Sequence, residues 1–180
     1  MKIIYTTLMA LGLIMPVMAQ NRQVEESQIT LNLLLPGVIY EAAVGDRSTM
    51  ALEGTIGFQY VESSFSESGF GIYPIGRLQY RNYLNFDRRL SKGKNIAGNS
   101  GNYIAPLLAV QGGKAFIGDL DFYEDYFALA GAVYGLQRTG KKGLQFRFEV
   151  GPAYLFSEYD GGFAIATALK LGFVLGKSRR

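Results

Sequence analysis

The sequence predicts an all-β fold, an eight-stranded antiparallel up-and-down transmembrane β-barrel. The first observation is residues 143–158, where even positions are apolar or aromatic and odd positions are polar, charged or small. Successive side chains of a strand point to opposite faces, so one face of this segment is apolar throughout. The second is that the alternation recurs along the chain, which is typical of membrane-spanning strands. The third is composition, because 23 Gly, 12 Phe and 12 Tyr suit a curved wall bordered by aromatic side chains.

An export signal is predicted at the N-terminus. Lys2 supplies a positive charge, an apolar stretch runs to Met18, and Ala19 stands at a suitable cleavage position. We expect residues 1–19 to be a cleaved signal peptide and residues 20–180 to be one outer-membrane β-barrel domain; an uncleaved anchor is the alternative. No other stretch of about 18 residues is apolar enough for a spanning helix. An exported, strand-rich chain of this kind is expected in the outer membrane of a Gram-negative bacterium.

The strands follow in chain order from turn residues and alternation. Residues 28–44 form either one long strand or two short ones. Bacterial single-chain barrels have even strand numbers, so two strands joined at Pro36-Gly37 are favoured, for a total of eight. Gly112-Gly113 predicts a bulge in the fifth strand. The six later strands are predicted at 49–62, 70–84, 103–116, 126–137, 143–158 and 163–176.

The connections between these strands alternate between two ends of the barrel, and the two ends differ in charge. Connections 45–48, 85–102 and 139–142 and the tail from Lys177 are predicted on the periplasmic side, which is basic. Its cations are Arg47, Arg88, Arg89, Lys92, Lys94, Arg138, Lys141, Lys142, Lys177, Arg179 and Arg180. The external connections are predicted at 36–37, 63–69, 117–125 and 159–162, without Lys or Arg. Their acidic residues are Glu62, Glu67, Asp119, Asp121, Glu124, Asp125, Glu158 and Asp160.

Charged side chains at inward positions predict an ion-pair network that plugs the lumen. The interior of an eight-stranded barrel is just wide enough for side chains to fill, so these groups replace an apolar core. A narrow polar pathway or a paired-carboxylate site is the less favoured alternative. The predicted residues of the network are Glu41, Glu53, Arg77, Arg81, Arg147, Glu149 and Lys170.

Hairpin register predicts the neighbours within this network. Glu41 is expected opposite Glu53, and Glu53 opposite Gln79. Glu149 is expected diagonal to Lys170. Two carboxylates opposite each other repel unless cations approach them, and Arg77 and Arg81 are expected as the diagonal neighbours of Glu53.

Two loops carry dense charge. The external acidic loop contains Asp119, Asp121, Glu124 and Asp125, and is interpreted as a solvated rim rather than a weak Ca²⁺ site. The periplasmic basic loop begins with Arg88, Arg89, Lys92 and Lys94, and is interpreted as solvated, with contact to anionic polymers or headgroups as the alternative. Its second half, 95–102, is rich in Gly and Asn and is predicted to be mobile.

Enzymatic chemistry is not expected. The chain has no His and no Cys, which removes the usual base for a nucleophilic serine and the usual metal ligands. Ser-Lys chemistry is not expected either, and no cofactor or metal is predicted. The net charge of +3 is too small to indicate a nucleic-acid partner.

The chain resembles the small eight-stranded outer-membrane barrels, the OmpA-barrel and OmpX-like group, and other single-domain Gram-negative barrels. The resemblance rests on Asn32-Leu33-Leu34, on Tyr40-Glu41, and on Leu171-Gly172-Phe173 followed by Lys177. It implies a fold and no activity.

The expected function is therefore non-enzymatic, with a structural or surface-interaction role. A narrow channel, or a carrier for small or apolar solutes, is the alternative. The expected partners are outer-membrane lipid and lipopolysaccharide, the barrel-assembly machinery and, as a further option, periplasmic polymers.

Overall fold

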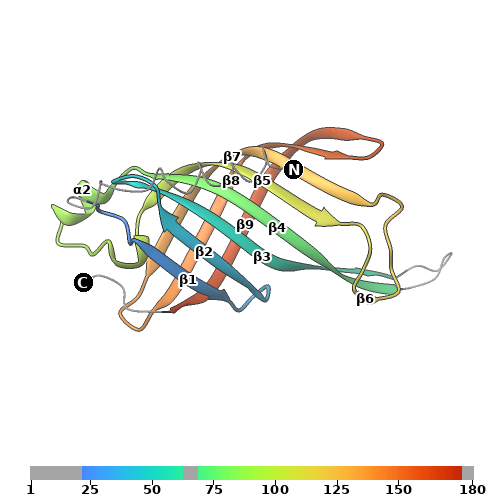
Figure 1. Cartoon of the computed structure of the whole chain (residues 1–180), viewed down its shortest axis with the longest axis horizontal. Coiled ribbons are helices and arrows are strands. Elements are labelled where there is room, and N and C mark those ends of the chain that lie inside the picture. The colour runs from blue at the N-terminus through green and yellow to red at the C-terminus, as the bar shows by residue number, and fades with distance from the viewer. Residues whose placement is uncertain (1–21, 63–68, 176–180) are drawn as a thin grey trace, which may run out of the picture.

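The chain folds into one antiparallel β-sheet that closes on itself (Figure 1). The computed structural model describes residues 22–62 and 69–175. The predicted signal peptide, Glu67 and the basic tail from Lys177 lie outside these residues. The elements are β1 (Ser27–Asn32), β2 (Gly37–Ala43), β3 (Ser48–Val61), β4 (Gly69–Tyr83), α2 (Phe86–Leu90), η1 (Ala97–Asn99), β5 (Asn102–Gly112), β6 (Ile117–Gly118), β7 (Tyr126–Thr139), β8 (Leu144–Ser157) and β9 (Gly161–Leu175).

Eight of these strands form a closed ring in which each long strand pairs with the next one along the chain. The ring closes where β9 pairs with β1, in a register that sets Leu31 opposite Phe173. The two-residue strand β6 pairs with β4 beyond the end of β5 and takes no place in the ring. The prediction of eight strands, with two of them in residues 28–44, is confirmed. The turn between those two occupies residues 33–36, since Gly37 already belongs to β2.

The fifth strand is shorter than predicted, and the bulge prediction at Gly112-Gly113 is wrong. β5 ends at Gly112, and the next residue enters a turn in which the Gly113 N–H donates to the Asp125 carbonyl at 2.8 Å. A Cβ atom on Gly113 would lie 1.7 Å from the carbonyl oxygen of Glu124, so only glycine fits this approach. Lys114 therefore belongs to the connection between β5 and β7, which was predicted to carry no cation.

The ring has two different ends (Figure 1). At the end that we call the basic end, the connections are residues 44–47, 84–101 and 140–143, and α2 and η1 lie there. At the opposite end, called the acidic end, the connections include 113–125 and 158–160. Apart from Lys114, the predicted sorting of charges between the two ends holds for the described residues.

The outer face of the ring is apolar. Exposed large hydrophobic side chains lie on all eight ring strands, among them Leu31, Tyr40, Leu52, Leu78 and Leu108. They alternate with side chains that point inward, as the burial patterns of β1, β4 and β8 show. Inside, at the basic end, an aromatic and aliphatic core is buried; its residues are Val24, Tyr83, Phe86, Tyr103, Ala105, Leu107 and Val133.

The charged residues of the ring strands follow the same division. Eight charged residues occur in these strands, and seven of them point inward. The exception is Arg138, which stands next to the end of β7 at the basic end, where its Nη2 donates to Asn102 Oδ1 at 2.7 Å. The described part of the chain contains no helix of the length and apolarity needed to cross a membrane.

Candidate functional site

The seven predicted network residues come together inside the ring, in the half of the strands nearer the basic end. They reach the interior from five strands, β2, β3, β4, β8 and β9. Six of the seven form ion pairs with one another, and Arg77 has the most exposed side chain of these six, at 12%. The seven residues are Glu41, Glu53, Arg77, Arg81, Arg147, Glu149 and Lys170.

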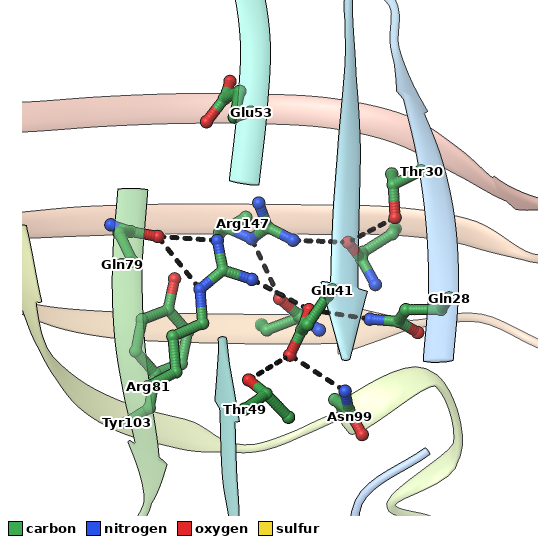
Figure 2. Close-up of polar contacts among 12 residues, drawn as sticks. Gln28, Thr30, Glu41, Thr49, Glu53, Gln79, Arg81, Asn99, Tyr103 and Arg147 are labelled. Carbon is green, nitrogen blue, oxygen red and sulfur yellow. Dashed lines mark hydrogen bonds and ion pairs between the residues drawn. The ribbon is translucent and has the colours of Figure 1, made fainter. Parts of the chain in front are cut away.

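Glu41 lies at the end of the network nearest the basic end, and each of its oxygens is fully used (Figure 2). Arg81 Nη1 donates to its Oε2 at 2.8 Å, and Gln28 Nε2 donates to the same oxygen at 2.8 Å. Oε1 accepts from Thr49, Tyr83 and Asn99 at 2.7, 2.7 and 2.9 Å. Five donors therefore compensate one buried carboxylate, as the cost of desolvating a charge requires.

Glu53 and Glu149 lie farther toward the acidic end and share Arg77. Arg77 donates from Nη2 to Glu149 at 2.8 Å and from Nη1 to Glu53 at 3.4 Å. Lys170 Nζ also donates to Glu53 Oε2, and Asn32 donates to Oε1 of Glu53 at 3.2 Å.

Arg81 links the two parts of the network. Its Nη2 lies 3.8 Å from Glu149 Oε1, while its Nη1 pairs with Glu41. The guanidinium also lies 5.2 Å from the ring centroid of Tyr103, whose hydroxyl donates to Glu149 at 2.5 Å. A continuous chain of ion pairs thus runs from Lys170 to Glu41 across the interior.

Arg147 differs from the other cations. Its Nε donates to Gln137 at 2.8 Å and its Nη2 donates to Gln145 at 2.9 Å, both to neutral amides. Among the described residues it has no carboxylate within ion-pair distance, and its Nη1 has no hydrogen-bond partner. The network therefore holds four cations against three carboxylates, and Arg147 carries the unpaired charge.

The pairing predictions are wrong in two hairpins. Glu41 lies opposite Ala51 rather than Glu53, and Glu53 lies opposite Arg77 rather than Gln79. Each register differs from the prediction by two residues. A shift of two keeps every side chain on its face and changes only its neighbour.

The third pairing prediction, that Glu149 is diagonal to Lys170, is confirmed. Glu149 lies opposite Ala168, which makes Lys170 its diagonal neighbour, although the hairpin closes at a different pair of residues than expected. Lys170 itself lies directly opposite Arg147.

A segment of the connection between β4 and β5 closes the network at the basic end. We call residues 96–100 the plug segment; Gly98, Asn99 and Ser100 are buried in it. The carbonyl of Gly98 accepts from Gln137 Nε2 at 2.9 Å and from Gln145 Nε2 at 3.2 Å. The prediction that residues 95–102 are a mobile loop therefore fails for the plug segment, which is held by these hydrogen bonds.

Glycine is required at the centre of the plug segment. Gly98 has φ +58°, in the left-handed region. A Cβ atom there would lie 2.7 Å from Thr139 Oγ1, so a side chain would push the segment away from β7.

On the acidic side of the network the interior contains a cavity of about 490 Å³. Its base is formed by Glu53, Arg77 and Lys170. Its walls are mostly apolar or small, with Ile75, Ala109, Leu129, Ala166 and Ala168 among them, and Thr55, Gln111 and Thr167 add polar groups. The interior of the ring is therefore layered. From the basic end to the acidic end it contains the plug segment, the charge network and the cavity.

The predicted acidic and basic loops do not line this cavity. Two carboxylates of the acidic loop accept hydrogen bonds from backbone N–H groups near it. Asp119 Oδ1 accepts from the Phe70 N–H at 3.2 Å, and Asp121 Oδ1 accepts from the Ala115 N–H at 2.8 Å. Glu124 and Asp125, the other two members of the predicted acidic loop, lie at the surface. The four residues of the predicted basic loop lie at the surface as well. The basic residues are Arg88, Arg89, Lys92 and Lys94.

Ser-Lys chemistry is not expected from the sequence, yet the chain does contain a Ser-x-x-Lys pattern. Ser91 and Lys94 stand in a Ser-x-x-Lys pattern after α2. Both are exposed, and Ser91 Oγ donates to the Arg88 carbonyl at 3.1 Å. A nucleophilic serine needs a base within hydrogen-bond reach and a sheltered site, and this turn supplies neither among the described residues.

Sequence reasoning missed the neutral partners of the network. Tyr83, Tyr103, Gln137 and Gln145 occupy inward positions on their strands, so alternation could have identified them. Asn99 lies in a connection, where no periodic signal points to the interior.

No cluster of three or more potential metal ligands occurs among the described residues.

Comparison of the chain with protein-family models, with curated proteins and with solved structures gave no match.

Proposed function

We propose that the protein is a non-enzymatic outer-membrane β-barrel of a Gram-negative bacterium, with a structural or surface-interaction role and a lumen closed by its charge network. The proposal includes export through the N-terminal signal peptide and kinship in fold with the OmpA-barrel and OmpX-like group. One observation carries it: seven of the eight charges in the ring strands point inward while every ring strand exposes apolar side chains outward. A ring in water has the opposite distribution.

Strand length supports the same conclusion. β3 and β8 have 14 residues each, and β4 and β9 have 15. At about 3.3 Å per residue and a tilt of about 40°, a strand of this length rises roughly 35 Å, enough for a hydrocarbon band of about 25 Å and both interfaces. Where β1 pairs with β9, over residues 172–175, closure also satisfies backbone groups that an open sheet edge would leave unpaired in lipid.

The charged ends support an orientation. Two connections at the basic end, 44–47 and 140–143, are short, as periplasmic turns of such barrels are, whereas 84–101 is the long exception and contains the plug segment. The acidic end would then lie at the outer surface, where carboxylates next to lipopolysaccharide share its bridging divalent cations. Outer-membrane lipid, lipopolysaccharide and the barrel-assembly machinery are the partners that follow, with periplasmic polymers as a further option at the basic loops.

The network and the plug segment favour a closed lumen over the alternative of a channel. Six of the seven charges form a continuous series of ion pairs across the interior. Opening a path for ions would separate buried partners, each at a cost of about 3–5 kcal/mol. The plug segment adds a second barrier on the same axis.

Two measurements test the proposal. Cell fractionation with heat-modifiable gel migration should place the folded protein in the outer membrane. Single-channel recording of the purified protein in planar bilayers should show no sustained unitary currents, with a reference porin as the positive control. Recovery in the soluble periplasmic fraction would overturn the membrane assignment. Sustained currents would overturn the closed lumen and favour the channel.

A further inference from the structure

The wall of the ring has an opening on one side. β1 pairs with β9 only over residues 172–175, and β2 pairs with β3 only as far as Thr55. Beyond these points, residues 161–170 of β9 and 56–61 of β3 each have a strand partner on one side only, among the described residues. Figure 1 shows the cause, since the β1–β2 hairpin ends well before β3 and β4 do.

The cavity above the charge network passes through this opening. Ala166, Ala168 and Lys170 line it from the inner face of β9, and Leu169 and Leu171 line it from the outer face of the same strand. Alternate residues of a strand point to opposite faces. Both sets can line one cavity only where the cavity continues around the free edge of the strand.

The hairpin turn at the lower rim of the opening is suited to apolar surroundings. Leu33, Leu34 and Leu35 are 51%, 55% and 46% exposed. Pro36 has no N–H, and Thr55 Oγ1 donates to its carbonyl at 3.1 Å. The Leu33 N–H donates to the Leu171 carbonyl at 2.8 Å. Three exposed leucines in succession suit a turn that faces hydrocarbon, and the Leu33 N–H and the Pro36 carbonyl are paired within the ring.

The height of this turn places the opening inside the apolar layer. β2 has seven residues and rises roughly 18 Å by the strand geometry used above. The longer strands rise about twice as far. With the basic end in the periplasm, the opening therefore faces the outer half of the hydrocarbon layer.

The base of the cavity offers hydrogen-bond donors. The Lys170 ammonium has three N–H groups, and within the described residues it donates one hydrogen bond, to Glu53. About 10% of its side chain is exposed, at the cavity. The unpaired cation of the network, Arg147, lies directly opposite Lys170 on the neighbouring strand, so a carboxylate bound at Lys170 would also offset the surplus positive charge.

We propose that this cavity binds a long-chain fatty acid that enters sideways from the membrane. The carboxylate would accept hydrogen bonds from Lys170 at the base, and the hydrocarbon chain would run along Ala166 and Leu129 to the opening. The cavity volume of about 490 Å³ falls in the range of small-molecule sites, roughly 300–1,000 Å³. The inference rests on the proposed membrane location, and it develops the carrier alternative without requiring the lumen to conduct ions.

The chain has no Trp, so one introduced Trp becomes the sole reporter. Phe127→Trp places it in the cavity wall, and Tyr134→Trp places it on the outer face of the same strand. Each variant is folded into phospholipid vesicles and titrated with 9,10-dibromostearic acid, whose bromines quench Trp on contact. The proposal predicts saturable quenching of the Phe127→Trp reporter that palmitic acid reverses, and weaker, non-saturable quenching of the other.

Two further variants of the Phe127→Trp reporter test the site itself. Ala166→Phe fills the cavity and should abolish the saturable quenching, whereas Ala132→Phe, the same change on the outer face of β7, should preserve it. Lys170→Gln should weaken binding of the acid at least tenfold, to the level of its methyl ester. Gel migration confirms that each variant is folded.

The outcomes separate the two proposals. If brominated phospholipid fails to quench the Tyr134→Trp reporter, the outer face does not contact lipid and the proposed function fails. If it quenches that reporter while the acid gives no saturable quenching in the cavity, only the fatty-acid site is overturned. Equal binding of acid and ester would overturn the role of Lys170, and a stable dimer joined at the free edges would assign the opening to a second copy.

Discussion

Asn99 donates a hydrogen bond of 2.9 Å from Nδ2 to Oε1 of Glu41, 58 positions earlier in the chain. This contact joins the plug segment to the charge network, because Glu41 also pairs with Arg81. Asn99 is buried, and its backbone has φ +56°, a conformation that Asn adopts more readily than most residues. The connection between β4 and β5 is therefore part of the ring interior.

Asn99→Asp replaces the donor by a carboxylate of the same shape. Glu41 then loses one hydrogen bond and faces a like charge, so we expect the free energy of unfolding to fall by about 1–3 kcal/mol. Urea unfolding in phospholipid vesicles measures the change. Asn95→Asp is the matched control, because Asn95 is exposed and the hydrogen bonds from Arg89 go to its backbone carbonyl. Equal losses in both variants would contradict the link between plug and network.

The two buried arginines nearest Glu41 should differ in their importance. Arg81→Gln leaves Glu41 without its ion-pair partner, and breaking a buried pair in this way costs about 3–5 kcal/mol. Arg147→Gln removes hydrogen bonds to neutral amides, worth about 0.5–1.5 kcal/mol each, and also removes the unpaired charge. Equilibrium unfolding of the two variants under identical conditions compares them directly. A larger loss for Arg147→Gln would show that the ion pairs do not stabilise the ring.

At the basic end, Asp87 lies on the exposed side of the connection that leads to the plug segment. The hydrogen bond from Gln23, and then the contact with Arg47, holds the pKa of Asp87 below its ordinary value. A lowered pKa means that this carboxylate contributes stability above the ordinary value, and that the contribution is lost as the pH falls through the lowered pKa. The side chain is exposed, so the effect on stability is small and is best observed on the group itself.

Gln23→Ala should therefore raise the pKa of Asp87 toward its ordinary value. NMR titration of the carboxyl carbon measures it. Lys92→Ala serves as the control, because it removes a cation from the same connection without removing a hydrogen bond to Asp87. An unchanged pKa in Gln23→Ala, or an equal rise in the control, would contradict the assigned cause.

Alternation in the sequence predicted which side of the wall the residues of β3, β4, β8 and β9 face, but not those of β5, which is apolar on both faces, or of the Ala/Gly-rich β7. It placed Glu41 and Glu149 in the interior, and it did so even where the predicted register was wrong. The face depends only on whether a position is odd or even, so an error of two residues leaves it intact. The neighbours depend on how each turn closes. Val44 and Gly45 both donate to the Ser48 carbonyl, a closure that the turn residues alone did not indicate.

Features that depend on contacts between distant segments could not be predicted in this way. The plug segment is irregular, and nothing in its Gly/Asn-rich sequence distinguishes burial from mobility. The opening in the wall follows from the difference in length between the β1–β2 hairpin and the strands beside it. Strand lengths contained this information, since residues 28–44 were known to allow only short strands, but the consequence for β9 needs the closed ring.

The outer face gives the most direct test of the bilayer as its surroundings. Leu78 and Leu144 are nearly equally exposed, at 39% and 41%. Leu78 lies well within β4, whereas Leu144 is the first residue of β8, at the basic end. If lipid surrounds the ring, Leu78→Arg should cost about 2–4 kcal/mol and Leu144→Arg about 0–1 kcal/mol, since the penalty for Arg falls toward the interface. Reversible folding into phospholipid vesicles measures both. In a ring surrounded by water the two substitutions would cost little and equally, so a difference below the experimental error would contradict the membrane location on which the fatty-acid site also depends.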